Sequence, residues 1–329
     1  MKINELVTGT NQAFLAIVKE FSFGRTNNGQ GSEYMDLTLA DSSGDISGKI
    51  WDVGYHQKAQ VTQFGLVRAE GPISLYKEKK QIKITSIEKV VIDDSVNILD
   101  YVKTAPIASD SLVKYIHGVA NLITDDVLKA ITWYCIEKVG DALGQAPAAQ
   151  KMHHAYFGGL AYHMSRMLQI GNWIIESRPI INGSLLRAGI ILHDIAKPVE
   201  MIHSMGMVAD YSFEGKLIGH INLIYGWILE ACYKLGIDPA DKRVSLLQHL
   251  VLSHHNTGEW GSPVQPQTIE AVALHYIDQL DAKLQMAEDA ILSSDPETQW
   301  TPKVFSLENK PLYKHGVAEF PTDNATSST

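Results

Sequence analysis

The sequence contains only two cysteines among its 329 residues, Cys135 and Cys232. Both lie in apolar stretches that predict helices, where a cysteine is ordinarily a small buried hydrophobe. They therefore predict neither a disulfide framework nor a thiolate metal site. The chain also lacks an apolar run of the roughly 18 residues that a membrane-spanning helix needs, and its start lacks a basic segment followed by an apolar one. We expect a cytoplasmic protein that does not cross a membrane.

An excess of positive charge is also missing, because the net charge is −9. This argues against a protein that coats nucleic acid by bulk electrostatic attraction. The charge is uneven: residues 1–92 hold 11 lysines and arginines against 10 acidic residues, and the remainder holds 17 against 27. The acidic second part suits the binding of cations, and the nearly neutral first part can carry a local basic surface. The length is sufficient for two domains of ordinary size.

The first 92 residues predict a small β-barrel. Five β-rich segments are separated by polar turns and cover residues 12–23, 34–39, 46–51, 66–76 and 82–84. Met35, Leu37 and Leu39 alternate with polar residues, which is the pattern of a strand with one buried face. A polar connection able to form a helix separates the third segment from the fourth. Five short strands with this break fit a closed barrel of the OB type.

Basic residues of this barrel lie where OB domains commonly contact single strands. Arg25 follows the first strand, and Lys77, Lys79 and Lys80 surround the turn before the last one. Cations combined with aromatic faces can hold single-stranded RNA or DNA, so we predict these four residues as substrate contacts. The alternative is a packing or oligomerisation module whose aromatic residues belong to its core. The sequence leaves open which aromatic side chains face outward and whether the chain forms a homo-oligomer.

The remainder of the chain predicts a linker, a helical domain and a tail. Residues 93–110 predict the linker, and residues 111–315 the helical domain, because their apolar residues recur with the helical period and no strand-length alternation is present. Residues 316–329 are polar and predict a disordered tail. The predicted fold is therefore multidomain, with an N-terminal five-stranded OB-type barrel over residues 1–92 followed by an all-α domain.

Side chains able to bind metal recur on the apolar faces of the predicted helices. Ten of the thirteen histidines lie between residues 153 and 275, and an apolar run from Leu185 ends abruptly in His193-Asp194. Five predicted helices each carry such a side chain within or at the end of their core-facing stripe, namely His163, His193 with Asp194, His220, His254 with His255, and Asp278. Any one alone is explained as a paired residue of the core. Five together predict convergence on one metal site.

This ordered series resembles that of the HD-domain metal-dependent phosphohydrolases. Longer motifs carry a closer likeness, at residues 153–160 (HHAYFGGL), 193–197 (HDIAK), 214–220 (EGKLIGH), 253–255 (SHH), 261–263 (GSP) and 275–283 (HYIDQLDAK). With them the chain is similar to the YhaM-type bacterial 3′→5′ exoribonucleases, which join an N-terminal OB fold to an HD domain. The resemblance covers nearly the whole chain except the predicted tail.

The resemblance implies a catalytic site with two divalent cations bridged by Asp194. One side would be completed by His163, His193 and Asp278, and the other by His220, His254 and His255. Nitrogen and oxygen donors without thiolates favour Mn²⁺, with Fe²⁺ or Co²⁺ as alternatives. Lys197, one turn past His193, would hold a phosphate oxygen as a second catalytic residue, and its alternative role is a solvated cation at the end of a helix.

Two further residues are predicted to contact substrate. His154 lies in the first of these motifs, where it can support the site or touch the strand. Trp260 follows the histidine pair in a loop with two glycines, and its ring offers a face for a terminal base. The alternative is that Trp260 packs on the neighbouring helix.

The activity implied by the resemblance is metal-dependent 3′→5′ hydrolysis of single-stranded RNA, with single-stranded DNA as a further candidate, to nucleoside monophosphates. A second hypothesis is an HD phosphohydrolase that acts on a small nucleotide, such as a cyclic dinucleotide, a dNTP or an alarmone, but this leaves the barrel without a role. A third is a non-catalytic binding protein with a structural metal. The sequence does not distinguish RNA from DNA and does not give the metal, the product length or the oligomeric state.

Overall fold

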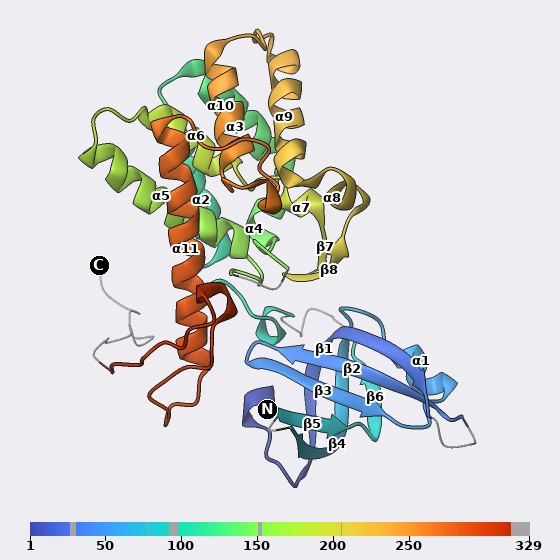
Figure 1. Cartoon of the computed structure of the whole chain (residues 1–329). Helices are drawn as coiled ribbons and strands as arrows, with labels where there is room; N and C mark the ends of the chain where they lie inside the picture. Colours follow the sequence, from blue (N-terminus) through green and yellow to red (C-terminus); the bar gives the residue numbers. More distant parts are fainter. Residues whose placement is uncertain (27–30, 78, 92–97, 151–152, 205, 317–329) are drawn as a thin grey trace, which may run out of the picture.

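The computed structural model describes residues 1–26, 31–77, 79–91, 98–150, 153–204 and 206–316. The chain forms a β-rich N-terminal lobe and a larger helical lobe, joined by the segment that follows residue 91 (Figure 1). The predicted boundary at residue 92 and the predicted tail beyond residue 316 lie outside the described residues. No helix in the described part of the chain is long and apolar enough to cross a bilayer.

The N-terminal lobe is a sheet that closes on itself. Its strands are β1 (Asn11–Arg25), β2 (Glu33–Asp41), β3 (Gly44–Ile50), β4 (Leu66–Tyr76), β5 (Lys79–Lys83) and β6 (Ser86–Lys89), with η1 (Ile3–Glu5) before them and α1 (Tyr55–Gln60) between β3 and β4. The strand order is β1-β2-β3-β5-β4-β6, and β1 also pairs with β4. This pairing completes the ring that the sequence predicts, and the OB-type fold is confirmed.

The predicted fifth strand corresponds to β5, and it is followed by β6, a sixth strand that was not predicted. β5 pairs with β3 and with the end of β4, and β6 then pairs with the beginning of β4. Where β5 ends, the chain passes very close to Gly71, where an added Cβ would lie 2.0 Å from the Lys83 carbonyl oxygen. Glycine at this position of β4 therefore allows the chain to bend around the barrel. Both Ile82 and Ile84 are buried, as their alternation predicts.

The helical lobe surrounds α6. Its helices are α2 (Ser109–Asn121), α3 (Asp126–Val139), α4 (Ala142–Gln145), α5 (Gly159–Ser177), α6 (Gly183–Leu192), α7 (Lys197–Glu200), α8 (Phe213–Leu217), α9 (Gly219–Leu235), α10 (Lys242–Ser253) and α11 (Ile269–Ser293), with the short helices η2 (Ile98–Tyr101), η3 (Gly258–Trp260) and η4 (Phe305–Leu307). α2 begins inside the predicted linker. α6 packs against α2, α3, α5, α10 and α11.

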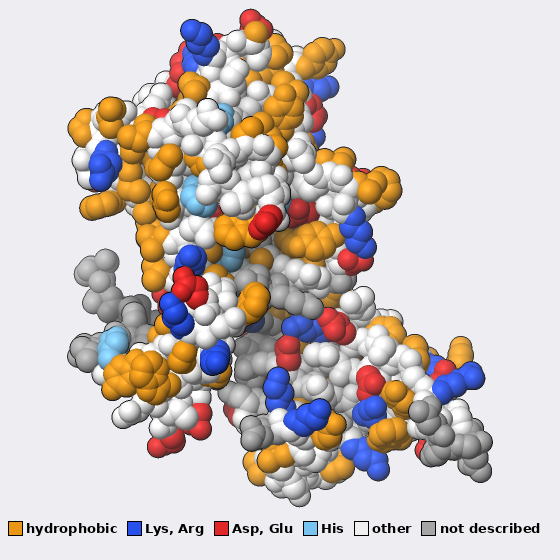
Figure 2. All heavy atoms as spheres, viewed as in Figure 1, with side chains coloured by type: hydrophobic (Ala, Val, Ile, Leu, Met, Phe, Trp, Pro, Cys, Tyr) orange, Lys and Arg blue, Asp and Glu red, His pale blue; other side chains and the backbone are white. Residues whose placement is uncertain are grey.

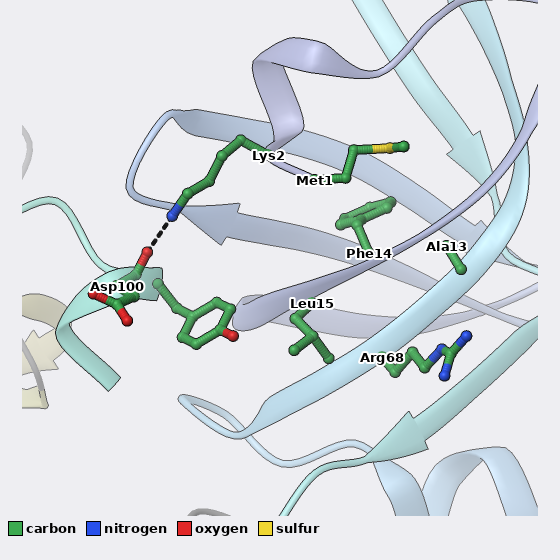
Figure 3. A pocket seen from close by; sticks show the side chains of 8 residues that line it. Met1, Lys2, Ala13, Phe14, Leu15, Arg68 and Asp100 are labelled. Atoms are coloured by element: carbon green, nitrogen blue, oxygen red, sulfur yellow. Dashed lines mark hydrogen bonds between the residues drawn. The ribbon is translucent and has the colours of Figure 1, made fainter. Parts of the chain in front are cut away.

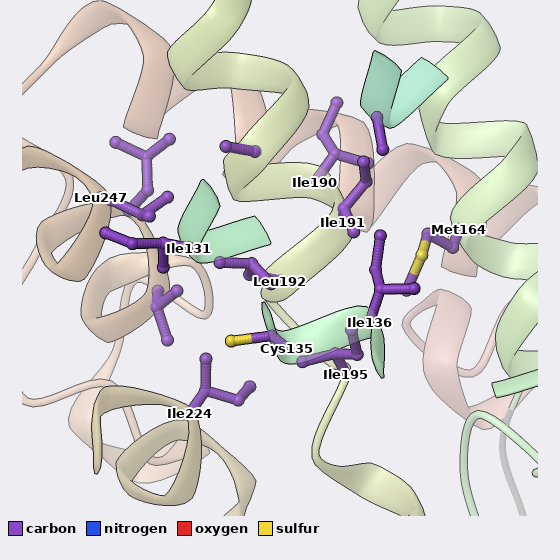
Figure 4. Packing of buried hydrophobic residues seen from close by; sticks show 14 of the residues in the cluster. Ile131, Cys135, Ile136, Met164, Ile190, Ile191, Leu192, Ile195, Ile224 and Leu247 are labelled. Atoms are coloured by element: carbon purple, nitrogen blue, oxygen red, sulfur yellow. The ribbon is translucent and has the colours of Figure 1, made fainter. Parts of the chain in front are cut away.

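The sequence of α6 explains its central place. Eight of its ten residues are buried, and Ile190, Ile191 and Leu192 lie among the side chains of neighbouring helices (Figure 4). At Gly189 an added Cβ would lie 2.4 Å from a side-chain carbon of Leu250, so glycine lets α10 approach closely. A helix that is apolar on all sides belongs in the middle of a bundle. Its C-terminal end consequently delivers the next two residues to the interior.

One hairpin departs from the all-helical expectation. β7 (Met201–Ser204) pairs with β8 (Met207–Tyr211) between α7 and α8. Strands of four and five residues are too short for their alternation to stand out in a sequence. Beyond α11, isolated bridges join Trp300 to Tyr313 and Val304 to Lys310. The chain from residue 294 to 316 thus consists of turns, the short helix η4 and isolated bridges, and it contains no α-helix.

The two lobes share a small apolar joint. Ile17 and Leu66 of the barrel and Val102 after η2 form a separate buried cluster, and Phe157 and Met207 of the helical lobe pack against it. η2 lies beside β1, and its Asp100 carbonyl accepts a hydrogen bond from Lys2, with a cavity of about 600 Å³ between them (Figure 3). This cavity contains none of the predicted metal ligands. The joint ties the barrel directly to the segment that contains His153 and His154.

Candidate metal centre

The structure brings the predicted metal ligands together around Asp194. This carboxylate follows the end of α6, and its two oxygens face different histidines. Oδ2 lies 3.3 Å from Nε2 of His193 and 4.0 Å from Nε2 of His163, whereas Oδ1 lies 3.2 Å from Nε2 of His220 and 3.9 Å from Nε2 of His254. α11 adds Asp278, whose Oδ1 is 3.3 Å from Nε2 of His163. Asp194 therefore lies between two groups of donors.

Four of these imidazole nitrogens are buried without a hydrogen-bond partner among the described residues. They are the Nε2 atoms of His163, His193, His220 and His254, and Oδ1 of Asp194 shares this condition. Several lie within ion-pair distance of a carboxylate, but none meets it in hydrogen-bonding geometry. A buried polar atom left unpaired costs about 1–3 kcal/mol, so five such atoms around Asp194 indicate partners that are not part of the chain. A divalent cation on each side of Asp194 fits this arrangement.

Two of the histidines are oriented by their own helices. Nδ1 of His193 donates to the Ile190 carbonyl at 2.7 Å, and Nδ1 of His254 donates to the Val251 carbonyl at the same distance. A hydrogen on Nδ1 leaves the lone pair on Nε2, which is the tautomer that binds a metal. In both cases the histidine donates to the carbonyl three residues before it. This is possible because both histidines lie at a helix C-terminus, where carbonyl groups lack helical partners.

The other two histidines are oriented by carboxylates. Nδ1 of His163 donates to Asp281 at 2.7 Å, and Nδ1 of His220 donates to Glu200 at 2.8 Å. Glu200 also accepts the backbone N–H of His220 at 3.0 Å. Glu200 is not among the residues predicted from the sequence. Glu200 lies three residues after Lys197, at the end of the short helix α7. This position indicates a role in the site only once His220 is known to lie nearby.

Two sets of donors are each compact enough to hold a metal ion. One comprises Asp194, His220, His254 and His255, and the other comprises Asp194, His163 and His193, with donor atoms of each set within 4.8 Å of one another. Neither cysteine belongs to these donor sets, and both are buried elsewhere. The residues present fit a two-metal site that shares Asp194.

Charge balance in the site depends on these groups. Burial would raise the pKa of the Asp194 carboxyl, but Lys197 and His193 hold it well below its usual range. Burial would lower the pKa of His163, yet the carboxylates of Asp278 and Asp281 raise it to about 9. Without a cation a proton therefore balances these acids, and metal binding would displace it.

A cavity of about 190 Å³ gives access to the site. Its lining includes Asp194, Lys197, Asp278, Trp260 and His153. The Nζ atom of Lys197 is 2.7 Å from Oδ2 of Asp194. Trp260 is 56% exposed, so it is not a core residue. Its backbone carbonyl accepts a hydrogen bond from Nδ1 of His255 at 2.5 Å. The cavity thus places a cation and an aromatic face beside the candidate metal ligands.

His154 does not reach this cavity. It is fully buried, Nδ1 lies 2.8 Å from the Tyr156 hydroxyl, and Nε2 lies 2.8 Å from Asp281. Because both ring nitrogens are engaged, the structure favours the first of its two predicted roles, support of the site through Asp281, which Arg166 also contacts at 2.9 Å. The neighbouring residue, His153, lines the cavity instead.

The basic residues predicted on the barrel differ in availability. Arg25, Lys77 and Lys79 are exposed. Lys80, in contrast, donates to the carbonyls of Asn4 at 3.2 Å and Leu6 at 2.6 Å. Lys80 therefore fastens the N-terminal segment to the barrel, but the residue is exposed, and its role as a substrate contact stays a prediction.

The barrel carries an aromatic surface on its outer face that was not predicted from the sequence. The rings of Tyr34 and Trp51 lie 5.4 Å apart, and Nζ of Lys49 lies 3.9 Å and 4.6 Å from their centroids. Gly24 on β1 leaves room for the Tyr34 ring, since a Cβ there would lie 2.3 Å from it. The alternation that buries Met35 puts Tyr34 on the opposite, outer face, which was the available signal. We call Tyr34, Lys49 and Trp51 the barrel platform.

Comparisons with known proteins agree with this architecture. The family model described as HD domain matches residues 160–283. The 3′-5′ exoribonuclease YhaM of Geobacillus sp. (strain WCH70) is 37% identical over 298 residues, covering 91% of this chain and 90% of the relative. The protein of the same name from Bacillus subtilis (strain 168) is 36% identical over 302 residues, covering 91% and 93%.

Two solved OB-fold structures show a partial likeness to this chain. The second OB-fold domain of replication protein A from Methanococcus maripaludis is 19% identical, covering 28% of this chain and 96% of that one, with a TM-score of 0.24. An OB domain from Thermoplasma acidophilum is 12% identical, covering 30% and 92%, with a TM-score of 0.25. The relatives that match along most of the chain confirm the family that the sequence motifs predict. The chain belongs to the YhaM family of 3′-5′ exoribonucleases.

Proposed function

We propose that this chain is a metal-dependent 3′-5′ exoribonuclease that hydrolyses single-stranded RNA to nucleoside monophosphates, with single-stranded DNA as a second candidate substrate. The observation that carries the proposal is Asp194, a buried carboxylate whose two oxygens face two separate sets of unpaired imidazoles. Membership of the YhaM family supports the 3′-to-5′ direction of hydrolysis and RNA as the kind of substrate.

The proposed cofactor is a pair of divalent cations. His163, His193 and Asp278 would hold one, His220, His254 and His255 the other, and Asp194 both. Cations so held lower the pKa of an attacking water and offset the charge that develops on the phosphate. We propose Mn²⁺ because the donors are imidazole and carboxylate, with Fe²⁺ and Co²⁺ as the alternatives.

Lys197 is proposed to hold a non-bridging phosphate oxygen. Burial would lower the pKa of its ammonium group, but Asp194 raises it, so Lys197 is charged at neutral pH. Its side chain lines the cavity beside Asp194 and Asp278. A fixed cation at this point stabilises negative charge on the phosphate without having to reorganise during the reaction.

The small volume of the cavity favours the end of a strand over a free small nucleotide. Pockets that enclose a small ligand typically measure about 300–1,000 Å³, whereas this cavity measures about 190 Å³. A terminal nucleotide would place its phosphate inside and leave its base outside, over the exposed ring of Trp260. The barrel then has a role in holding the rest of the strand.

Replacing Trp260 with alanine is expected to raise KM for oligonucleotides roughly tenfold or more. The reason is the loss of stacking on a terminal base, worth about 1–3 kcal/mol. Thermal stability and metal content should not change, because the ring is more than half exposed. Trp300→Ala, which removes a ring of nearly equal exposure (55%) outside the cavity, is the matched control. A lower melting temperature with an unchanged KM would assign Trp260 to packing instead.

The barrel is proposed to bind the strand through its platform and the exposed lysines of the β4–β5 turn. Deleting residues 1–92 would also expose Val102, Phe157 and Met207 at the joint, so point substitutions are the better test. Trp51→Ala should weaken binding of long single strands about fivefold or more, and added salt should weaken binding modestly, because few phosphates are contacted.

Fluorescence anisotropy with a labelled oligonucleotide in EDTA measures this binding without hydrolysis. Hydrolysis of a generic small phosphodiester by Trp51→Ala, measured with metal present, should match wild type. Tyr76→Ala, beside Lys77, is the comparison variant. If Tyr76→Ala weakens binding and Trp51→Ala does not, the strand follows the turn lysines and avoids the platform.

The proposed function is tested by comparing two kinds of substrate. Full-length protein with Mn²⁺ is given an end-labelled RNA and, separately, a panel of cyclic dinucleotides, dNTPs and alarmones. We expect release of mononucleotides from the RNA and little turnover of the panel. Efficient turnover of one small nucleotide with intact RNA would favour the alternative hypothesis. A cytoplasmic location and a homo-oligomer stay predictions.

A further inference from the structure

α5 and α11 form one outer wall of the helical lobe. They run antiparallel, because His163 near the start of α5 contacts Asp281 in the middle of α11, whereas Asn182 beyond α5 donates its backbone N–H to Glu270 at the start of α11, at 2.8 Å. Figure 1 shows the two helices side by side at one edge of the lobe. Their inner faces hold His163, Asp278 and Asp281, and their outer faces are free for another use.

The outer face of α11 is apolar along most of its length. The exposed fractions are 43% for Ile269, 42% for Val272, 66% for Tyr276, 47% for Leu280 and 45% for Leu284. Steps of three or four residues put them on one stripe. An exposed helix of a monomeric protein ordinarily carries polar residues on this side, so the stripe requires a partner.

Two residues outside α11 widen the stripe into a face. Trp173 on α5 is 68% exposed and Ile180, just beyond α5, is 78% exposed. Figure 2 shows hydrophobic side chains gathered along this edge, over α5 and α11. We call these seven residues the α5–α11 face, comprising Trp173, Ile180, Ile269, Val272, Tyr276, Leu280 and Leu284.

The size of the face matches half of a stable protein interface. Two of the seven side chains are aromatic and can bury roughly 150–250 Å² each, and the five aliphatic ones are smaller, so with exposed fractions of 42% to 78% the face offers at most on the order of 700 Å². The largest apolar patch on a typical monomer is roughly 300–600 Å². A standard interface buries roughly 800 Å² on each partner. A face of this area suits a protein partner better than a nucleic acid, whose phosphates require cations.

We propose that the α5–α11 face binds the same face of a second copy of this chain, forming a two-fold dimer. An isologous contact uses one patch twice, so a single apolar face is sufficient for it. The stripe on a helix of 25 residues gives a helix pair in which side chains three and four apart interdigitate. Asp278 and Asp281 face the opposite side of α11, so pairing leaves each candidate metal centre accessible. This inference does not depend on the proposed activity.

Oligomeric mass measured by light scattering after gel filtration tests the proposal on the full chain. Wild type at tens of micromolar should show twice the single-chain mass of 36.4 kDa. The variant carrying both Tyr276→Glu and Leu280→Glu should show the single-chain mass, with an unchanged circular dichroism spectrum. Phe213→Glu on α8, which replaces a 75% exposed side chain outside the face, is the control and should retain the wild-type mass.

A single-chain mass for wild type, or an unchanged mass for the double variant, would overturn the proposal. Cross-linking covers the case in which the double variant does not fold. Leu280→Cys treated with a short bis-maleimide should yield covalent dimers, whereas Phe213→Cys should not, and the native Cys135 and Cys232 are buried. Absence of dimers from Leu280→Cys would also contradict a contact through this face.

Discussion

Replacing Asp194 with asparagine is expected to reduce hydrolysis by roughly 10³-fold or more, with the helical lobe still folded. Asp194 is the only residue of the described chain whose oxygens face both sets of imidazoles, at 3.3 Å from His193 and 3.2 Å from His220. An amide keeps the volume but removes the charge that would hold two cations, so the charge on the phosphate is no longer offset. Metal content measured by plasma mass spectrometry should fall together with activity. Asp194→Ala should behave similarly.

The control for this substitution is Asp210→Asn. Asp210 also belongs to the helical lobe, but it is exposed and pairs with Lys216. Its replacement should leave both metal content and hydrolysis unchanged. A metal-stripped or Asp194→Asn protein with appreciable turnover would contradict a two-metal mechanism, whereas loss of the helical circular dichroism signal would assign the defect to folding.

Replacing Lys197 with methionine is expected to lower kcat about 10²–10³-fold while metal content is retained. Lys197 lines the cavity and carries its charge at neutral pH, so its loss removes a fixed cation that acts on the phosphate. Methionine preserves much of the packing of this buried chain, which is 9% exposed. The separation of activity from metal content distinguishes this variant from Asp194→Asn.

Steady-state kinetics with a short RNA and metal analysis of the same sample check the expectation. Thermal stability should be measured alongside, because removing the partner of Asp194 leaves a buried carboxylate less compensated when no cation is present. Equal losses of metal and activity would mean that Lys197 acts by maintaining the ligands. An unchanged kcat would mean that it is only a helix-end cation.

The candidate metal ligands could be predicted from the sequence because each lies on a helix with a clear apolar period or directly after the end of one. His163, His220 and Asp278 interrupt stripes of core residues, and a helical stripe has only one inward direction. The end of α6 is the strongest case, since a helix buried on all sides must place His193 and Asp194 in the interior. The five predicted barrel strands could be recognised in a similar way, because successive side chains of a strand face opposite sides of the sheet.

Residues whose roles depend on three-dimensional neighbours could not be predicted in this way. Glu200 matters because α7 ends beside α9, and nothing in its local sequence indicates that neighbour. Lys80 has the same exposed, charged context in the sequence as Lys79, yet only Lys80 reaches the carbonyls of Asn4 and Leu6. His154 and His153 are adjacent, and which one faces the cavity depends on a backbone turn in which His154 has a positive φ of 53°.

The most direct test of the central claim is the polarity and metal dependence of RNA hydrolysis by the full-length chain. One RNA is labelled at its 5′ end and, separately, at its 3′ end, and is incubated with metal-stripped protein before and after Mn²⁺ is added. With Mn²⁺, the 3′ label should appear at once as mononucleotide, while the 5′-labelled strand shortens progressively, and EDTA should stop both reactions. Release of the 5′ label first, or hydrolysis by the metal-stripped protein, would contradict the account.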